Sequence, residues 1–298
     1  MKNDLLDIDF SKPHILDSSG YNSFLHLRNI CFGDTNKFIN DFSDIFEDDM
    51  ETYVISDLFS RVVSCATVFK MGDLCYKNKC IKEVMVSYGI CTLPEYEGLG
   101  LGSAITGFAK DRILKKNMLP ILSPANSSLN NFYNHLGYSN AFYMNEFQFS
   151  KNNIAPSDFS FSIKKVTFTD YINKREQFLN NILHIKLSSR AMDLVYYYYD
   201  DFYFLYQNND LIGIFIIDDD FHKESLFIPE FLFSPDCKFD LQTFSGLFFE
   251  KFSNEKILIR TVAKKDSSNP ISKGMAFGKV DLNIKESDQL PYLGFYFE

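Results

Sequence analysis

The sequence contains no tryptophan and no long apolar run. Phenylalanine is abundant instead, with 32 residues, which indicates aromatic-rich packing and no particular function. No stretch of about 18 uncharged apolar residues is present, so we expect no membrane-spanning helix. The first ten residues, MKNDLLDIDF, are rich in acids and lack the apolar core of a secretory signal. These absences predict a cytoplasmic protein.

An excess of positive charge is also missing. Lysine and arginine together number 30 against 39 aspartates and glutamates, which gives a formal net charge of −9. Generic nucleic-acid binding needs a basic stripe that displaces counterions, so we do not expect nucleic acid as a partner. The net charge still permits a local basic pocket for one anionic cofactor.

The cysteines form no metal-binding or redox motif. None of the six belongs to a C-x-x-C pair, and no histidine cluster accompanies them. A chain of 298 residues does not need disulfide bonds to stabilise its core. We therefore expect free thiols and no metal site. The cysteines are Cys31, Cys65, Cys75, Cys80, Cys91 and Cys237.

The length and the pattern of elements predict two domains. Helical and strand patterns alternate up to a polar break, KNNIAPSD, which contains Pro156. The second half then repeats a similar order of elements with almost no sequence identity to the first half. We therefore expect two copies of one α/β (α+β) fold, in domains 1–152 and 158–298.

The segment LPEYEGLGLGS, residues 93–103 and here called the glycine loop, is the strongest functional signal. Gly98, Gly100 and Gly102 follow a strand pattern and directly precede a helical one. A helix N-terminus carries unpaired N–H groups and a partial positive charge, and glycines let a phosphate approach them closely. The spacing fits neither a Walker loop nor the dinucleotide fingerprint. Taken alone, the loop could equally be a connecting turn.

Two stretches together resemble the motifs of the GNAT acetyltransferases. The first, YGICTLPEYEGLGLGSAI, resembles the family's strand, T/V-x-P-x-Y element, R/Q-x-x-G-x-G/A loop and helix. The second, SPANSSLNNFYNHLGYSNAF, resembles the polar turn and Tyr-containing helix that end in a Leu-Gly-Phe/Tyr corner. Both occur in the family's order and spacing. Glu97 departs from the family pattern, because it stands where arginine or glutamine is usual.

The resemblance extends over the whole chain. LRNICFGD, YGICTLPEY and the final LPYLGFYFE are similar to a bacterial group with two GNAT units, as in the enhanced-intracellular-survival acetyltransferases without their sterol-carrier-like domain. This implies that each unit is a mixed, mostly antiparallel twisted sheet flanked by helices, with a splayed strand pair for the cofactor in the first unit. The segment FSPDCKFDLQTF has no glycine run, so the second unit is expected to be degenerate and to shape the substrate site.

The resemblance also implies a set of residues that bind acetyl-CoA. The strand residues are expected to line the pantetheine arm through their main chain, the glycine loop to hold the pyrophosphate, and the later polar residues to contact the cofactor tail. Each of the polar residues has the alternative of being a helix cap or a surface amide. The set comprises Ile90, Cys91, Thr92, Gly98, Leu99, Gly100, Leu101, Gly102, Ser103, Asn126, Ser128 and Asn131.

Two residues are catalytic candidates by the same resemblance. Tyr133 matches the family's catalytic tyrosine, which protonates the coenzyme A thiolate, although a tyrosine in a helix can also simply pack it on a sheet. The C-terminal carboxylate of Glu298 is a candidate for the general base, because the similar survival proteins bring their chain end to the active site. No metal is expected in the reaction.

The resemblance therefore implies direct transfer of an acetyl group from acetyl-CoA to a primary amine of a small molecule or peptide. The expected partners are acetyl-CoA and the amine, and a homo-oligomer remains open. The alternative is a GNAT-like protein that binds coenzyme A, or acts as a regulator or scaffold, without catalysis. Glu97 favours that alternative, because it places a negative charge where phosphates would approach.

Overall fold

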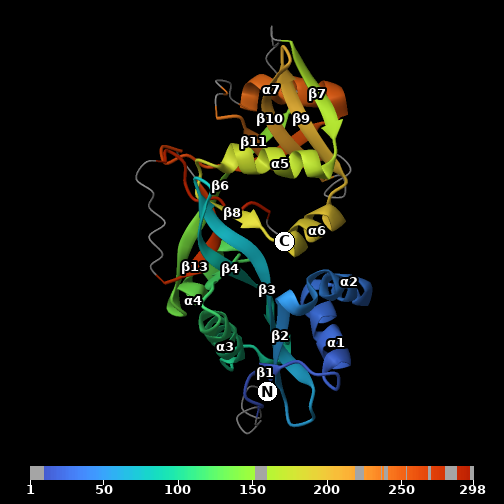
Figure 1. Cartoon of the computed structure of the whole chain (residues 1–298). Helices are drawn as coiled ribbons and strands as arrows, with labels where there is room; N and C mark the ends of the chain where they lie inside the picture. The colour runs from blue at the N-terminus through green and yellow to red at the C-terminus, as the bar shows by residue number, and fades with distance from the viewer. Residues whose placement is uncertain are drawn as a thin grey trace.

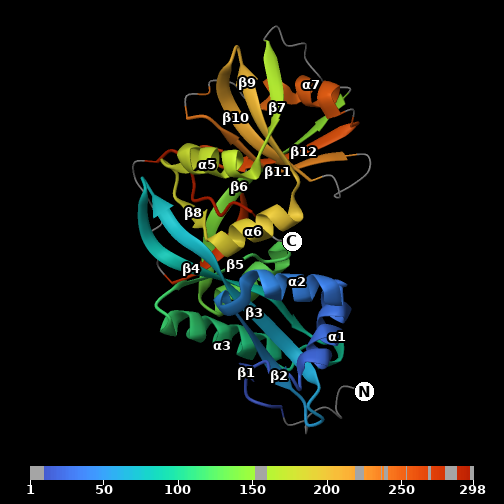
Figure 2. The same ribbon diagram turned by 45° about the vertical axis from the view of Figure 1, so that its right-hand side comes forward.

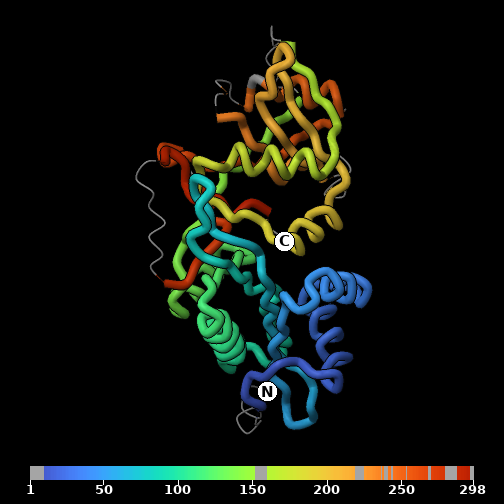
Figure 3. Tube along the Cα trace, viewed as in Figure 1, coloured from blue at the N-terminus to red at the C-terminus, as the bar shows by residue number. Residues whose placement is uncertain are grey.

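The computed structural model describes residues 10–151, 160–218, 225–235, 237, 241–252, 254–267, 270–278 and 287–295. It has two lobes joined by one sheet, with the N-terminal half below and most of the C-terminal half above in Figure 1. The segment 287–295, here called the C-terminal segment, runs between the two lobes, as the red tube in Figure 3 shows. The C-terminal segment therefore contributes to the middle of the molecule.

The N-terminal half begins with a short strand and two helices and then forms a sheet. α1 and α2 lie on one side of β2–β4, and α3 lies on the other (Figures 1 and 2). Its elements are β1 (His14–Ile15), α1 (Tyr21–Phe32), α2 (Asn36–Phe46), β2 (Met50–Ser56), β3 (Val62–Tyr76), β4 (Lys79–Thr92), α3 (Leu101–Lys115), β5 (Leu119–Leu122), η3 (Ser127–Leu129), α4 (Asn130–His135) and β6 (Tyr138–Ser150), with 3-10 turns η1 (Glu47–Asp49) and η2 (Pro94–Tyr96).

The second half repeats this order with one additional short strand between its first two helices and, among the described residues, without a counterpart of α4. Its elements are β7 (Phe161–Val166), α5 (Phe168–Leu179), β8 (His184–Leu187), α6 (Ser189–Tyr198), β9 (Asp201–Gln207), β10 (Asp210–Ile217), β11 (Ser225–Phe233), α7 (Leu241–Phe252), β12 (Lys256–Val262) and β13 (Ile271–Phe277). In the first half α3 connects the parallel strands β4 and β5, and in the second half α7 connects the parallel strands β11 and β12.

The two halves share a single sheet. Its order is β1-β2-β3-β4-β5-β13-β6-β12-β11-β10-β9-β7, so the last strand, β13, lies between β5 and β6 of the first half. β8 pairs with the long strand β3, which forms a second connection between the halves. All pairings except β4 with β5 and β11 with β12 are antiparallel. The expected mixed, mostly antiparallel sheet flanked by helices is confirmed.

Helices cover both faces of β3, which explains why its sequence is an almost continuous apolar run. Val63, Cys65 and Phe69 are 0% exposed, and so are Ala66 and Val68 on the alternate face. A strand covered on both sides loses the polar alternation of a half-exposed one. The helices begin where the sequence provides caps: the hydroxyl oxygens of Thr35, Thr167 and Ser188 accept backbone N–H bonds at the starts of α2, α5 and α6.

A buried polar cluster fixes the C-terminal segment to the second half. Glu230 on β11 accepts hydrogen bonds from the Tyr171 hydroxyl (2.7 Å), the Arg175 Nε (2.9 Å) and the Tyr292 hydroxyl (3.0 Å). Arg175 and Glu230 are both 0% exposed. Burial alone would lower the pKa of Arg175, but the adjacent Glu230 carboxylate raises it, so the arginine stays charged.

Removing the carboxylate should therefore destabilise the protein strongly. We expect Glu230→Ala to lower the free energy of unfolding by about 3–5 kcal/mol, because it leaves the Arg175 charge buried without a partner. The control Glu83→Ala removes a half-exposed carboxylate 2.6 Å from Lys70 and should cost only about 0–1 kcal/mol. Urea denaturation measures both values, and equal losses would contradict a structural role for the buried pair.

Candidate functional site

The site begins where two parallel strands separate. β4 and β5 pair only from Val84 with Leu119 to Ser87 with Leu122. Beyond Ser87, β4 continues to Thr92 and pairs with β3 alone. The β4 edge that faces β5 therefore has no ladder partner over its last residues, and its backbone N–H and C=O groups can bind an extended ligand. Ile90, Cys91 and Thr92, expected from the sequence to line the pantetheine arm, lie on this stretch.

A β-bulge marks the separation. Tyr88 lies opposite Thr67 and Cys91 opposite Cys65, so β4 carries one more residue than β3 over this interval. Gly89 in the bulge has φ +58°, and a Cβ there would lie 1.3 Å from the Arg28 Nη1. Only glycine satisfies both conditions, because the arginine side chain is packed directly on the backbone.

The glycine loop follows β4 and leads into α3. Gly98 and Gly100 have φ of 80° and 81°, and a Cβ at either position would meet nothing within 4 Å. Gly100 caps the start of α3 in this left-handed conformation without a side-chain hydrogen bond. The first turn of α3 therefore presents unhindered backbone N–H groups at an exposed surface, which is the arrangement that binds phosphate. The loop from Gly98 through Ser103 thus forms one continuous feature beside the separated strands.

Tyr96 holds the start of this loop in place. It is 6% exposed, and its hydroxyl accepts a hydrogen bond from the Arg61 Nη2 and donates to the Asp57 Oδ2 at 3.2 Å. Burial would raise the pKa of Asp57, but hydrogen bonds from the Arg61 and Phe59 N–H groups and from Tyr96 lower it overall. The proline-tyrosine element before the glycines therefore anchors the loop to the β2–β3 turn.

Glu97 lies exposed at the mouth of the glycine loop. Its backbone N–H donates to the Pro94 carbonyl oxygen, and its carboxylate makes no hydrogen bond or ion pair with any residue that the structure describes. Its carboxylate can therefore turn toward solvent.

The polar residues before α4 hold the local turn. The Asn126 Oδ1 accepts hydrogen bonds from the Ser128 N–H (3.1 Å) and hydroxyl, which caps the 3-10 turn η3. The Asn131 carbonyl oxygen contacts the His135 Nδ1 at 2.6 Å. All three residues expected to contact the cofactor tail, Asn126, Ser128 and Asn131, are exposed, and they lie outside the wall of the cavity described next.

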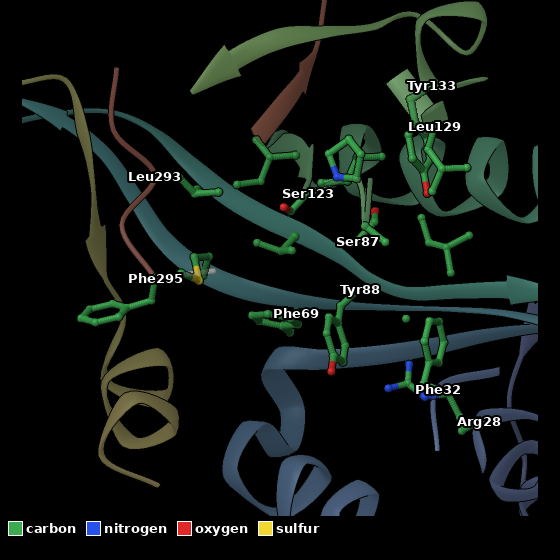
Figure 4. Close-up of a pocket in the computed structure, with 18 of the residues that line it drawn as sticks. Arg28, Phe32, Phe69, Ser87, Tyr88, Ser123, Leu129, Tyr133, Leu293 and Phe295 are labelled. Atoms are coloured by element: carbon green, nitrogen blue, oxygen red, sulfur yellow. The ribbon is translucent and has the colours of Figure 1, made fainter. Parts of the chain in front are cut away.

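A cavity of about 380 Å³, here called the central cavity, opens beside the separation of β4 and β5. Figure 4 shows Tyr133 entering it from α4, Tyr88 and Arg28 at one end, and Leu293 and Phe295 of the C-terminal segment at the other. Tyr133 is 6% exposed, and burial raises the pKa of its hydroxyl to about 12. Glu298, the other catalytic candidate, lies outside the described residues.

Cys91 contributes to the site through its backbone. Its thiol is 3.5 Å from that of Cys65 and also faces Cys31. Hydrogen bonds with Cys31 and Cys65, together with burial, raise the pKa of the Cys91 thiol. A thiol that stays protonated is a poor nucleophile, so the geometry disfavours an acyl-cysteine intermediate.

Two charged residues of the cavity wall were missed by sequence reasoning. Arg28, in α1, and Asp34, just after it, form an ion pair of 2.5 Å at the cavity wall. The signal available was LRNICFGD, in which Gly33 ends the helix and returns the chain toward Arg28. A lone arginine on a helix gives no other indication that it will be buried.

The comparisons with known proteins bear on the fold of the chain. No protein-family model matches the sequence, and no curated protein matches it. Among solved structures, a probable N-acyltransferase of unknown function from Enterococcus faecalis aligns with TM-score 0.68 and 14% identity, covering 90% of this chain and 72% of that one. Eis1 from Mycobacterium abscessus aligns with TM-score 0.58 and 10% identity, covering 90% and 73%.

A tandem GNAT protein from the clavulanic acid biosynthesis pathway aligns over nearly its whole length. Its TM-score is 0.54 at 10% identity, covering 90% of this chain and 97% of that one. The fold is therefore that of the GNAT acetyltransferases. More particularly, the alignment along both halves matches the tandem-GNAT arrangement, as the sequence motifs indicated.

Two features are absent from the described residues. No helix there is long and apolar enough to cross a membrane. No group of three or more His, Cys, Asp or Glu side chains in the same part of the chain is placed to hold a metal ion.

The backbone of the glycine loop can be tested directly. Gly100→Ala should lower the free energy of unfolding by about 1–2 kcal/mol, because a Cβ disfavours the left-handed conformation. The control Gly107→Ala lies within α3 with open space around its Cβ, and it should stabilise by about 0.5–1 kcal/mol. Denaturant titration measures both changes. A neutral Gly100→Ala would show that the loop is not held in this conformation.

The charge at the loop mouth gives a second test. If the glycine loop holds the pyrophosphate of acetyl-CoA, Glu97→Arg should tighten binding of that ligand by roughly two- to fivefold, since an exposed charge near phosphates acts through solvent. Glu97→Gln should give a smaller gain in the same direction. Isothermal titration calorimetry measures both, and weaker binding by either variant would show that Glu97 has a role of its own.

Proposed function

We propose that this chain is an acetyl-CoA-dependent N-acetyltransferase that transfers the acetyl group directly to a primary amine of a small molecule or peptide. The observation that carries the proposal is that the β4–β5 separation and a buried tyrosine meet at one cavity, from which the free edge of β4 leads directly to the glycine loop and α3. We further propose the division into units 1–152 and 158–298, the second shaping the substrate site, and a cytoplasmic location.

The residues present fit an acyl-CoA. The free edge of β4 at Ile90–Thr92 would bind the pantetheine arm through main-chain groups, and Gly98–Ser103 with the start of α3 would hold the pyrophosphate. Bound acetyl-CoA supplies an activated acetyl group as a thioester. Backbone N–H groups at the Gly89 bulge would stabilise negative charge that develops on the carbonyl oxygen.

Tyr133 would act as the general acid. Its hydroxyl faces the central cavity and, with a pKa raised to about 12, carries its proton throughout the physiological range. It can therefore donate that proton to the thiolate that leaves.

We retain the C-terminal carboxylate of Glu298 as the proposed general base. What supports it is that Leu293 and Phe295, the nearest described part of the chain, line the same cavity as Tyr133. The competing proposal is a protein that binds coenzyme A without catalysis. Thiol release over a panel of amines distinguishes the two proposals.

Tyr133→Phe should separate catalysis from binding. We expect kcat to fall by roughly 10²–10⁴-fold, because the proton donor is lost, while acetyl-CoA affinity stays unchanged. The control Tyr138→Phe removes a neighbouring buried hydroxyl that lies outside the cavity wall, and it should leave kcat intact. Steady-state kinetics and calorimetry provide the two readouts. Equal kcat in wild type and Tyr133→Phe would contradict the acid role.

The pH dependence follows from the same residue. A general acid works only when protonated, so activity is lost as pH rises through its pKa. Because burial raises the pKa of Tyr133 to about 12, kcat should not fall between pH 8 and 10 on its account. A pH–kcat profile with an alkaline limb near pH 9 that disappears in Tyr133→Phe would contradict this.

A further inference from the structure

The central cavity contains a buried ion pair that the transfer chemistry does not use. The Asp34 Oδ2 accepts from the Arg28 Nε at 2.7 Å and lies 2.5 Å from its Nη2. Side-chain exposure is 4% for Arg28 and 14% for Asp34. The left-handed Gly33, with φ +73°, returns the chain so that Asp34 reaches back to the helix. These are the only charged side chains among the described residues that line the cavity.

The pair leaves one donor and one acceptor available. The contacts within the pair use the Nε and Nη2 of Arg28 and the Oδ2 of Asp34, so the Arg28 Nη1, which lies against Gly89, and the Asp34 Oδ1 take no part in them. The rings of Phe32 and Tyr88 flank the guanidinium, 4.8 and 5.0 Å from its central carbon. Both atoms can therefore bind a ligand that carries an acceptor and a donor close together.

The second half of the chain shows the corresponding position filled. Arg175 is the eighth residue of α5, as Arg28 is of α1. In β11 the parallel pairing with β12 is interrupted after Ile228, and Glu230 lies two residues beyond it. Gly89 occupies the corresponding place in β4, two residues beyond Ser87, where the pairing with β5 ends. In the second half the strand supplies its own carboxylate to the arginine. In the first half the strand residue is glycine, and the space opens into the cavity instead.

We infer that the acceptor amine is an α-amino acid with an apolar side chain. This rests on the proposed function, because it names the acceptor for the same site. An α-amino acid carries a carboxylate and an ammonium group close together at neutral pH. The carboxylate binds the Arg28 Nη1, and the ammonium group binds the Asp34 Oδ1. The ion pair thus orients the nitrogen beside the Gly89 bulge.

The opposite end of the cavity selects the side chain. Phe69, Met71, Leu293 and Phe295 line it and offer no charge to a ligand. Figure 4 shows this apolar end separated from Arg28 by Tyr88. A large apolar side chain fills this space and removes its own apolar surface from water.

The reaction balances as an ordinary transfer. The amino-acid nitrogen forms a bond to the acetyl carbon, and the carbon–sulfur bond of the thioester breaks. The ammonium group loses two protons in total: one ends on the released thiol and the other passes to solvent.

Binding of two product analogues tests the carboxylate directly. With coenzyme A present, calorimetry compares N-acetyl-L-phenylalanine with N-acetylphenethylamine, which lacks only the carboxylate. We expect the first to bind at least tenfold more tightly, and Arg28→Met to abolish that preference. The control Arg190→Met removes another arginine, paired with Glu47 at the surface, and should preserve it. Equal binding by wild type, or no binding of either analogue, overturns the inference, even if Arg28→Met does not fold.

Turnover separates this inference from the proposed function. Thiol release from acetyl-CoA is measured with L-phenylalanine and with phenethylamine, and kcat/KM should be at least tenfold higher for the amino acid. Equal values would overturn the inference and leave the transferase proposal standing. Carboxylate-dependent binding of the analogues without any thiol release would support the recognition site and overturn the transferase proposal.

Discussion

The end of parallel pairing between β4 and β5 after Ser87 is the constraint on which the site depends. The bulge at Gly89 turns β4 away from its neighbour, and the Arg28 side chain occupies the place where any other residue would carry a Cβ. The separated edge then leads directly into the glycine loop and α3, while Tyr96 fixes the position of that loop. A strand, a loop and a helix N-terminus are thereby aligned along one path suited to an extended anionic ligand.

Elements from the second half of the chain enclose the end of this path that lies at the central cavity. β13 lies beside β5, β8 lies beside β3, and the C-terminal segment crosses between the halves to line the central cavity. The cluster of Glu230 with Arg175 and Tyr292 holds that segment in place. The second half thus acts on the site through packing: it repeats the strand-helix-strand pattern of the first half, but its own arginine is already paired with a strand carboxylate.

The sequence predicted the alternation of helices and strands, and the strand and helix that flank the glycine loop, because caps and apolar periodicity are local signals. The same local signals indicated the GNAT fold. They gave no indication that β13 inserts between β5 and β6 or that β8 pairs with β3, because both pairings join residues far apart in the chain. Arg28 was missed for a similar reason: its burial depends on Gly89, which lies 61 positions later.

A crystal structure with bound coenzyme A tests the central claim most directly. The account predicts the pantetheine arm along Ile90–Thr92, the pyrophosphate on the backbone of Gly98–Ser103, and the thiol in the central cavity beside Tyr133. Coenzyme A bound elsewhere, for example in the cavity of about 500 Å³ between α5, β11 and β12 of the second half, would contradict it.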